Sequence, residues 1–305
     1  MGITRTALLA ALLVAIPLRA HAGDKAAWTA AKAALPKDTT VLIGLDLTQL
    51  TKSSLFTMAF PMILAQQGEA KEGLDLIKKH CNLDPLKVVS SVVAGTDDDQ
   101  KHGALFVSLN GVDQPKIVSC MEAIAKAKGN ADAKVVVTTD GKINELALGD
   151  KKIYLSWIGT NVLVMPLDFG NKADLTAWTA KGLAKSKVAK GMGKVATANA
   201  LWVVSAVPKD LDANTKMKTA YGSVAMANAS ISVDLNVQLP TAAAAKAAAE
   251  KSQKDLATVA QNPGLDPKLQ KIVSAVSVTA VGDELHAKGS VPESEVFSLV
   301  MALKN

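Results

Sequence analysis

Arginine is scarce in this chain of 305 residues, and the shortage narrows the functions to consider. The only two arginines, Arg5 and Arg19, lie within the first 22 residues. Sequence-specific DNA contacts and anion clamps favour the planar guanidinium group of arginine. Removing these two from the 34 basic residues leaves 32 lysines against 28 acidic residues, a net charge of +4. We therefore expect a protein that does not bind nucleic acid.

Long hydrophobic runs and aromatic residues are also few. A membrane-spanning helix needs ~20 apolar residues, and no stretch of the mature chain offers them. We expect no transmembrane segment there. Aromatic residues make up only 4% of the chain, although 49% of it is hydrophobic. The core must therefore be built mainly from aliphatic side chains.

The first 22 residues have the pattern of a secretory leader. Arg5 precedes an apolar run from Ala7 to Leu18, and the segment ends in Ala20-His21-Ala22. Small residues at these two alanine positions suit a signal peptidase, so we predict cleavage between Ala22 and Gly23. No cysteine lies near this site, and twin arginines are absent, which favours the general secretory route without a lipid anchor. The alternative is an N-terminal helix buried in the fold.

The chain has two cysteines, Cys81 and Cys120. An even number of cysteines in an exported chain favours a disulfide between them. The alternative is a pair of buried free thiols.

Two stretches of the chain share one sequence motif. A helical pattern ending near Cys81 is followed by Leu83-Asp84-Pro85, two strand patterns and a helix that opens at Pro115. The same order follows Leu265-Asp266-Pro267. We predict an α+β fold with two tandem helix-strand-strand-helix cassettes on antiparallel sheets and a β-meander between them. A strand before each cassette suggests a split β-α-β unit with both helices on one sheet face, bringing the cysteines together. The expected parts are the leader 1–22, a first domain 23–170 that contains the meander, a lysine-rich linker helix 171–198 and a second domain 199–305.

No pattern in the sequence establishes a catalytic, metal or cofactor site. His80 neighbours Cys81, but adjacent residues on a helix point in different directions. The consecutive acids Asp97, Asp98 and Asp99 lack the alternation of a calcium loop and suit a solvated hairpin loop. The G-x-G-x-x-A match at 191–196 follows no strand, so a loosened link between domains is favoured over a dinucleotide site. We expect no catalytic residues, metal ligands or cofactor, although an active site assembled from scattered residues stays open.

A lysine-rich stretch lies in the expected linker. As a basic amphipathic helix it could contact an anionic envelope surface. The favoured alternative is a solvated helix that joins two domains. The possible contact residues are Lys181, Lys185, Lys187, Lys190 and Lys194.

The leader, "LPKDTTVLIGLDL" from Leu35, "C-x-LDP" from Cys81 and "ALW" from Ala200 together resemble secreted two-repeat proteins of Gram-negative bacterial envelopes. The resemblance implies a periplasmic or secreted location and no particular activity. We therefore expect a non-enzymatic envelope protein that binds another envelope protein or has a structural role. The alternative is a carrier that holds a small apolar or lipid ligand between the helices and the apolar sheet face. An unidentified hydrolase is the third possibility.

Overall fold

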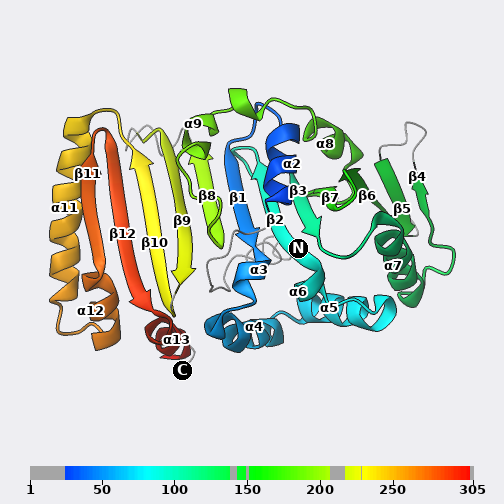
Figure 1. Ribbon diagram of the computed structural model, residues 1–305, viewed down its shortest axis with the longest axis horizontal. Coiled ribbons are helices and arrows are strands. Elements are labelled where there is room, and N and C mark those ends of the chain that lie inside the picture. The colour runs from blue at the N-terminus through cyan, green and yellow to red at the C-terminus, as the bar shows by residue number, and fades with distance from the viewer. Residues whose placement is uncertain (1–24, 138–142, 149–150, 207–216, 228, 303–305) are drawn as a thin grey trace. The chain divides into compact units, whose positions relative to one another are not determined.

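The computed structural model describes residues 25–137, 143–148, 151–206, 217–227 and 229–302 (Figure 1). The predicted leader and its cleavage site at Ala22 and Gly23 lie outside these residues. By contacts, the chain divides into two units, and each is an antiparallel sheet with helices, so the α+β class is confirmed. Unit 1 contains Gly23–Thr48 and Phe60–Ser186; unit 2 contains Gln49–Ala59 and Lys187–Asn305. Among the described helices, none has the length and apolar character that a membrane span requires.

The sheet of unit 1 has the strand order β1-β2-β3-β7-β6-β5-β4. The predicted meander is present as the last four strands in sequence, and β7 joins it to β3 by antiparallel pairing. The first three strands are β1 (Val41–Asp46), β2 (Val89–Thr96) and β3 (Gly103–Leu109). The meander strands are β4 (Val135–Val137), β5 (Ile143–Leu148), β6 (Lys151–Ile158) and β7 (Val162–Pro166).

Helices cover both faces of this sheet. Neighbouring strand residues point to opposite faces, so Phe106 and Val107 of β3 enter different layers. Phe106 is fully buried on the face where α2 packs against β2 and β3. Val107 belongs to the opposite cluster, which includes Ile117 and Met121 of α7. The helices assigned to this unit are α2 (Ala26–Ala34), α5 (Gly68–Cys81), α6 (Pro85–Val88), α7 (Gln114–Ala127), α8 (Lys172–Ala177) and the 3-10 turn η1 (Leu183–Lys185).

Small residues let α2 approach the sheet of unit 1 closely. The four alanines of α2 that are buried lie on one side of the helix. A Cβ on Gly95 of β2 would meet the Leu35 side chain at 2.7 Å, so only glycine leaves room for Leu35 after α2. Burying a leucine such as Leu35 completely contributes about 2 kcal/mol.

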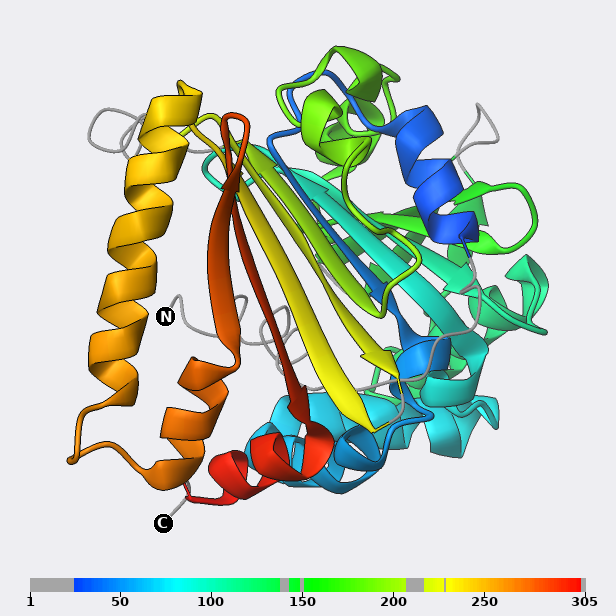
Figure 2. The same cartoon turned by 60° about the vertical axis from the view of Figure 1, so that its left-hand side comes forward.

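The sheet of unit 2 has the order β11-β12-β10-β9-β8. Figures 1 and 2 both show α11 running beside the edge strand β11. The Gln253 side chain of α11 accepts a hydrogen bond of 2.8 Å from the Val278 N–H, so part of this edge is capped against further strands. The strands are β8 (Leu201–Ala206), β9 (Thr219–Ala227), β10 (Ser230–Gln238), β11 (Val276–Val281) and β12 (Glu284–Pro292). The helices are α9 (Ala189–Met192), α11 (Ala242–Ala260), α12 (Pro267–Ser274) and α13 (Glu293–Ala302), while α3 (Leu47–Leu50) and α4 (Ser54–Gln66) contain residues of both units.

The repeated Leu-Asp-Pro phrase begins a short helix in each unit. The side chains of Asp84 and Asp266 accept hydrogen bonds from the first-turn amides of α6 and α12. The proline that follows each aspartate occupies a position where a helix needs no N–H donor. The apolar run after Leu265-Asp266-Pro267 begins at Ile272 and predicts a strand from that residue. This start is wrong, because α12 continues to Ser274 and β11 begins at Val276. The Leu-Asp-Pro motif occurs twice because it begins a short helix before a strand in each unit.

The repetition extends to the order of the elements but not to their packing. In unit 2, β10 and β11 both pair antiparallel with β12, so β10, α11 and β11 form a split β-α-β unit. In unit 1, β1 pairs directly and antiparallel with β2, and the predicted split unit is wrong there. The main contacts of α5 are with α7 and α6, whereas α11 packs mainly on β11 and α12. The two cassettes are therefore not equivalent copies.

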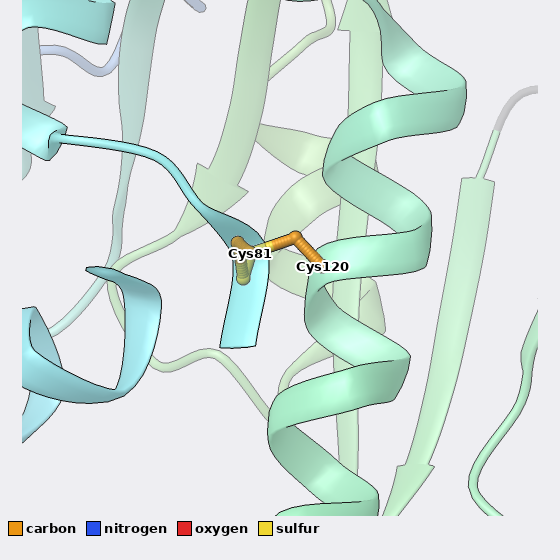
Figure 3. Close-up of a disulfide and its surroundings, with 2 residues drawn as sticks. All are labelled: Cys81 and Cys120. Atoms are coloured by element: carbon orange, nitrogen blue, oxygen red, sulfur yellow. A yellow bond between two sulfur atoms is a disulfide. The ribbon is translucent and has the colours of Figure 1, made fainter. Parts of the chain in front are cut away.

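The predicted bridge between Cys81 and Cys120 is present (Figure 3). It joins the last residue of α5 to the middle of α7, with 4.9 Å between the Cα atoms. Asn82 follows in the left-handed conformation and ends α5. Both half-cystines are buried, at 4% and 8% exposure. The bridge fixes α5 to a helix that packs on the sheet.

The single linker helix predicted for 171–198 is wrong. The stretch contains α8, η1 and α9, separated by turns. Lys181 has a positive φ of 55°, which breaks any continuous helix, and its N–H donates to the Ala34 carbonyl. The division between the units falls after Ser186.

Candidate binding site on the second unit

One face of the sheet in unit 2 carries most of the unit's polar strand residues. Strand alternation places every second residue of β9, β10 and β12 on this face, and the register aligns them across the three strands. Tyr221, Asn236 and His286 form one cross-strand row, and Ser223, Asp234 and Lys288 form the next. We call this surface the polar face. Its polar members on these strands are Thr219, Tyr221, Ser223, Ser230, Ser232, Asp234, Asn236, Gln238, Glu284, His286, Lys288 and Ser290.

Apolar and polar residues alternate from Ile231 to Leu239, a sequence pattern that predicts one dry and one wet face for β10. Burial departs from that prediction in the C-terminal half of the strand. Leu235 on the apolar side is 47% exposed, while Asn236 on the polar side is only 7% exposed. The prediction is wrong here because neighbouring strands and loops, rather than residue polarity, determine which side is covered. The Asn236 amide nitrogen donates to Asp234, but its buried Oδ1 has no hydrogen-bond partner among the described residues.

A buried carboxylate organises one end of the polar face. Glu284, whose side chain is 12% exposed, accepts hydrogen bonds of 2.5 Å from Lys194 Nζ and 2.8 Å from Tyr221 Oη. His286 Nε2 lies 3.3 Å from the same carboxylate. The Lys194 ammonium also lies 5.9 Å from the centre of the Tyr221 ring, within cation–π range. We call these four residues the Glu284 cluster.

The Glu284 cluster has the electrostatics of a stable ion pair. Burial raises the pKa of Glu284, but the hydrogen bonds from Lys194 and Tyr221 outweigh it and hold this pKa below its ordinary value of 4.5. Burial, followed by the hydrogen bond to Glu284, raises the pKa of Tyr221. At neutral pH the protonated phenol of Tyr221 therefore donates a hydrogen bond to the ionised carboxylate of Glu284. The ionised Glu284 carboxylate therefore holds the Lys194 ammonium in place.

The other end of the polar face is hollow. A groove of about 490 Å³ lies over the strands, and its walls include polar side chains from five separate segments. Asp234 and Lys288 form an ion pair of 3.0 Å in it. Around the ion pair, Asn199 donates to Ser223 Oγ at 2.8 Å, and the hydroxyls of Ser232 and Ser290 lie 2.9 Å apart. The lining residues are Ala196, Asn199, Ser223, Ala225, Ser232, Val233, Asp234, Ala275, Ser277, Lys288, Gly289 and Ser290. We call this hollow the polar groove.

The Glu284 cluster and the polar groove share one chain segment. Lys194 belongs to the turn after α9, and Ala196 and Asn199 of the following residues form a wall of the groove. Gly191 lets α9 sit close to the sheet, because a Cβ there would meet Val204 at 2.6 Å. The first glycine of the G-x-G-x-x-A match thus serves close packing. The pairing of Lys194 with Glu284 fixes the segment that carries the groove wall.

His102 and His286 are each paired with a carboxylate. His286 contacts Glu284, and His102 of unit 1 lies 2.9 Å from Asp174. Across the described chain, neither histidine is hydrogen-bonded to a serine or cysteine side chain, and both cysteines are in the disulfide. The Asp174 hydrogen bond raises the pKa of the half-exposed His102 above 6.5.

The other residues singled out in the sequence are scattered. Asp97 accepts hydrogen bonds from the backbone of its own hairpin loop, and the described residues contain no group of three or more potential ligands suited to a metal ion. Lys181 and Lys185 belong to unit 1, while Lys187, Lys190 and Lys194 belong to unit 2. No common helix presents them, and Lys194 is already paired. Contact of these lysines with an anionic surface stays a prediction.

Sequence reasoning missed Tyr221, Asn236, Glu284 and Lys194 as a group. The polar alternation of β10 was visible and could have indicated Asn236. The link from Lys194 to Glu284 spans 90 residues and depends on α9 packing over β9, which no local pattern encodes.

Comparisons with known proteins give only a distant likeness. No protein-family model matches the chain, and no curated protein matches it significantly. Crystal forms III, IV and I of TP0453 are similar in structure, with TM-scores of 0.44, 0.45 and 0.43 and 10% sequence identity in each case. The matches cover 88%, 91% and 90% of this chain and 96%, 99% and 96% of the solved chains.

Proposed function

We propose that this chain is an exported binding protein and that the polar groove of unit 2 holds its ligand. Export is supported by the leader pattern of residues 1–22 and by the Cys81–Cys120 disulfide, since such bridges persist in oxidising compartments. A disulfide-bonded chain is compatible with a periplasmic or secreted location.

The observation that carries the proposal is the convergence of polar groups in one hollow. Hydroxyl, amide, carboxylate and ammonium groups from five segments line the polar groove. The Glu284 cluster fixes one wall in advance, which reduces the entropy cost of ordering it on binding. Preorganised donors and acceptors are what a specific polar site requires.

The chemistry of the groove favours an uncharged or zwitterionic ligand. Asp234 and Lys288 neutralise each other at 3.0 Å, so the groove has little net charge. The four serine hydroxyls and Asn199 can both donate and accept hydrogen bonds. The lining contains no aromatic ring on which a sugar could stack. A short peptide, with alternating N–H and C=O groups, fits this pattern.

The test is native mass spectrometry of the chain purified from a bacterial envelope, followed by titration with short peptides. We expect a retained or titratable ligand whose occupancy falls at least tenfold in the Asp234→Ala/Lys288→Ala variant. The matched control is Lys251→Ala/Asp255→Ala, which removes a 2.9 Å ion pair of α11 outside both grooves of this unit. Equal occupancy in the two variants would show that the ligand does not use the polar groove.

A second candidate function, the carrier of an apolar ligand, is favoured by a different hollow. A groove of about 820 Å³ lies between α11 and β11, larger than the ~300 Å³ at which small-molecule pockets begin. Small apolar side chains such as Ala249 and Val278 line it, together with Lys246 and Lys254. The test variant here is Ala257→Trp, which should fill the groove and displace an apolar ligand. Asp234→Ala/Lys288→Ala is its control and should leave that ligand in place.

A further inference from the structure

The outermost strands of the two units, β4 and β11, have the composition of an unprotected sheet edge. Among the described strands, β4 has only β5 as its neighbour, and β11 has only β12. Natural sheets often protect such edges with lysine or proline on the edge strand. Neither 135–139 nor 276–281 contains a charged residue or a proline, and valine and threonine make up most of both stretches. Short uncharged segments of this kind pair readily with further strands.

Both strands also expose an apolar side chain. Among the described residues, Val136 of β4 and Val281 of β11 are the two most exposed large apolar residues, at 60% and 58%. A further strand beside either edge would cover part of this apolar surface, because side chains on neighbouring strands pack against each other. Each edge therefore offers an added strand both backbone hydrogen bonds and apolar burial.

In each unit, one helix side chain occupies this edge. Glu122 of α7 accepts a hydrogen bond of 2.8 Å from the Val135 N–H. Gln253 of α11 accepts a hydrogen bond of the same length from the Val278 N–H. The two contacts join residues 13 and 25 positions apart, and each side chain comes from a helix that packs against that strand. We call Glu122 and Gln253 the edge-capping residues.

Each edge-capping residue interrupts the row of amides that a further strand would use. Along an antiparallel strand, successive amides alternate between the paired neighbour and the opposite side. The amides of Val135 and Val137 therefore share the outer side of β4, and the cap takes one of these two. On β11 the outer row is Val276, Val278 and Ala280, and the cap takes the middle amide. A strand that pairs along either edge must first displace the cap.

We infer that Glu122 and Gln253 keep two copies of this chain from pairing edge to edge. A second copy fits each edge because it presents the same uncharged segment, which pairs antiparallel about a two-fold axis without bringing like charges together. The caps need to supply only an acceptor oxygen, so a carboxylate in one unit and an amide in the other serve the same purpose. The polar groove lies on a sheet face, and this role does not depend on it.

The first measurement is hydrogen exchange of the Val135 and Val278 amides in the unsubstituted chain, followed by NMR. Both amides should be protected to within about tenfold of the ladder amides of Val136 and Thr279, because both are hydrogen-bonded. Exchange of both amides at the rate of an unstructured peptide would overturn the inference, since the caps would then not hold the edges.

The second measurement is sedimentation velocity of variants over a range of concentrations. Glu122→Ala and Gln253→Ala remove the caps, and alanine preserves the helices. Each should self-associate about tenfold more strongly than the unsubstituted chain, the effect of about one net hydrogen bond. Glu122→Gln and Gln253→Glu keep an acceptor oxygen and should sediment like the unsubstituted chain. Circular dichroism should show that all four variants are folded.

Matched controls remove a side chain of the same type elsewhere. Glu72→Ala changes an exposed glutamate of α5, and Gln261→Ala changes an exposed glutamine at the end of α11. Both should sediment like the unsubstituted chain. Association that is equally strong in these controls, or that does not increase when either cap is removed, would overturn the inference.

A reversal experiment ties the association to the edges themselves. Val136→Lys in the Glu122→Ala chain should restore the sedimentation of the unsubstituted chain, because two-fold pairing would bring the added lysines together. Val281→Lys should do the same in the Gln253→Ala chain. Association that persists with the added lysine would place the contact elsewhere and overturn the inference. So would an unsubstituted chain that is already associated and that Val136→Lys dissociates, because its edge would then be open despite the cap.

Discussion

Removing the disulfide should destabilise unit 1 and leave unit 2 nearly unchanged. The perturbation is Cys81→Ala/Cys120→Ala, which deletes the bridge without adding a buried hydroxyl group. The two cysteines are 39 residues apart in the sequence. Closing a loop of that length lowers the entropy of the unfolded chain enough to contribute about 4 kcal/mol to the free energy of unfolding.

The assay is urea unfolding followed by tryptophan fluorescence. Trp178 reports on unit 1 and Trp202 on unit 2, and both are buried, at 5% and 3% exposure. Variants that retain one of these tryptophans separate the two transitions. With a dependence on urea of about 2 kcal/mol per molar, the unit 1 midpoint should fall by about 2 M.

The reduced, unsubstituted chain provides the control for side-chain loss. It should show nearly the same shift as the double variant, because both lack the covalent loop. A fall in stability below about 1 kcal/mol would refute the chain-entropy reasoning for this bridge. An equally large shift of the Trp202 transition would contradict the assignment of the effect to unit 1.

Three further predictions test local features of the fold. Asp266→Ala should cost about 1 kcal/mol of stability by removing the α12 cap, measured as a midpoint shift in the Trp202 transition, whereas Lys268→Ala beside it should cost little. Gly103→Ala should lower the free energy of unfolding of unit 1 by about 3 kcal/mol, because the added Cβ would collide with the Gly95 carbonyl. Gly73→Ala, with no neighbouring atom in its way inside α5, should raise it by about 0.5 kcal/mol. Both changes are measured as midpoint shifts in the Trp178 transition. His102 should titrate by NMR with a pKa above 6.5, and this pKa should return toward 6.5 in Asp174→Asn. Since the folded-state pKa is raised, the stabilisation by His102 is complete below pH 6.5 and is lost as the pH rises through the folded-state pKa. An unchanged pKa in Asp174→Asn would contradict the pairing.

Glu284 gives the opposite dependence on pH. Its folded-state pKa lies below the ordinary value of 4.5, so its stabilisation is complete above that value and lost as the pH falls through the folded pKa. The protection factors of residues 187–199 in hydrogen exchange, which correct for the intrinsic dependence of the exchange rate on pH, should therefore fall in acid. Glu284→Gln should show the lower protection at neutral pH already. Protection that is independent of both changes would mean that Lys194 does not hold this segment.

Elements that depend on a local pattern could be predicted from the amino-acid sequence. Local patterns predict a helix start at Pro115, a strand where residues alternate in β10, and turns between the strands of the meander. Each pattern acts through the backbone conformations that neighbouring residues allow. The even number of cysteines favoured the bridge, which the structure contains, whereas the secretory leader stays a prediction. Even the repeated Leu-Asp-Pro phrase was visible, although the sequence alone suggested a helix end where Asp84 and Asp266 begin a helix.

Strand pairing and the burial of each face could not be predicted in this way, because they depend on three-dimensional packing. β9 escaped notice because Gly222 and small residues weaken its pattern; the glycine is needed where the strand backbone approaches Leu235 and Asp234 closely. The joining of the meander to β3 and the exposure of Leu235 depend on neighbours distant in sequence. The Glu284 cluster depends on contacts across 63 and 90 residues. Such contacts arise from packing of the whole unit, and a local sequence pattern does not encode them.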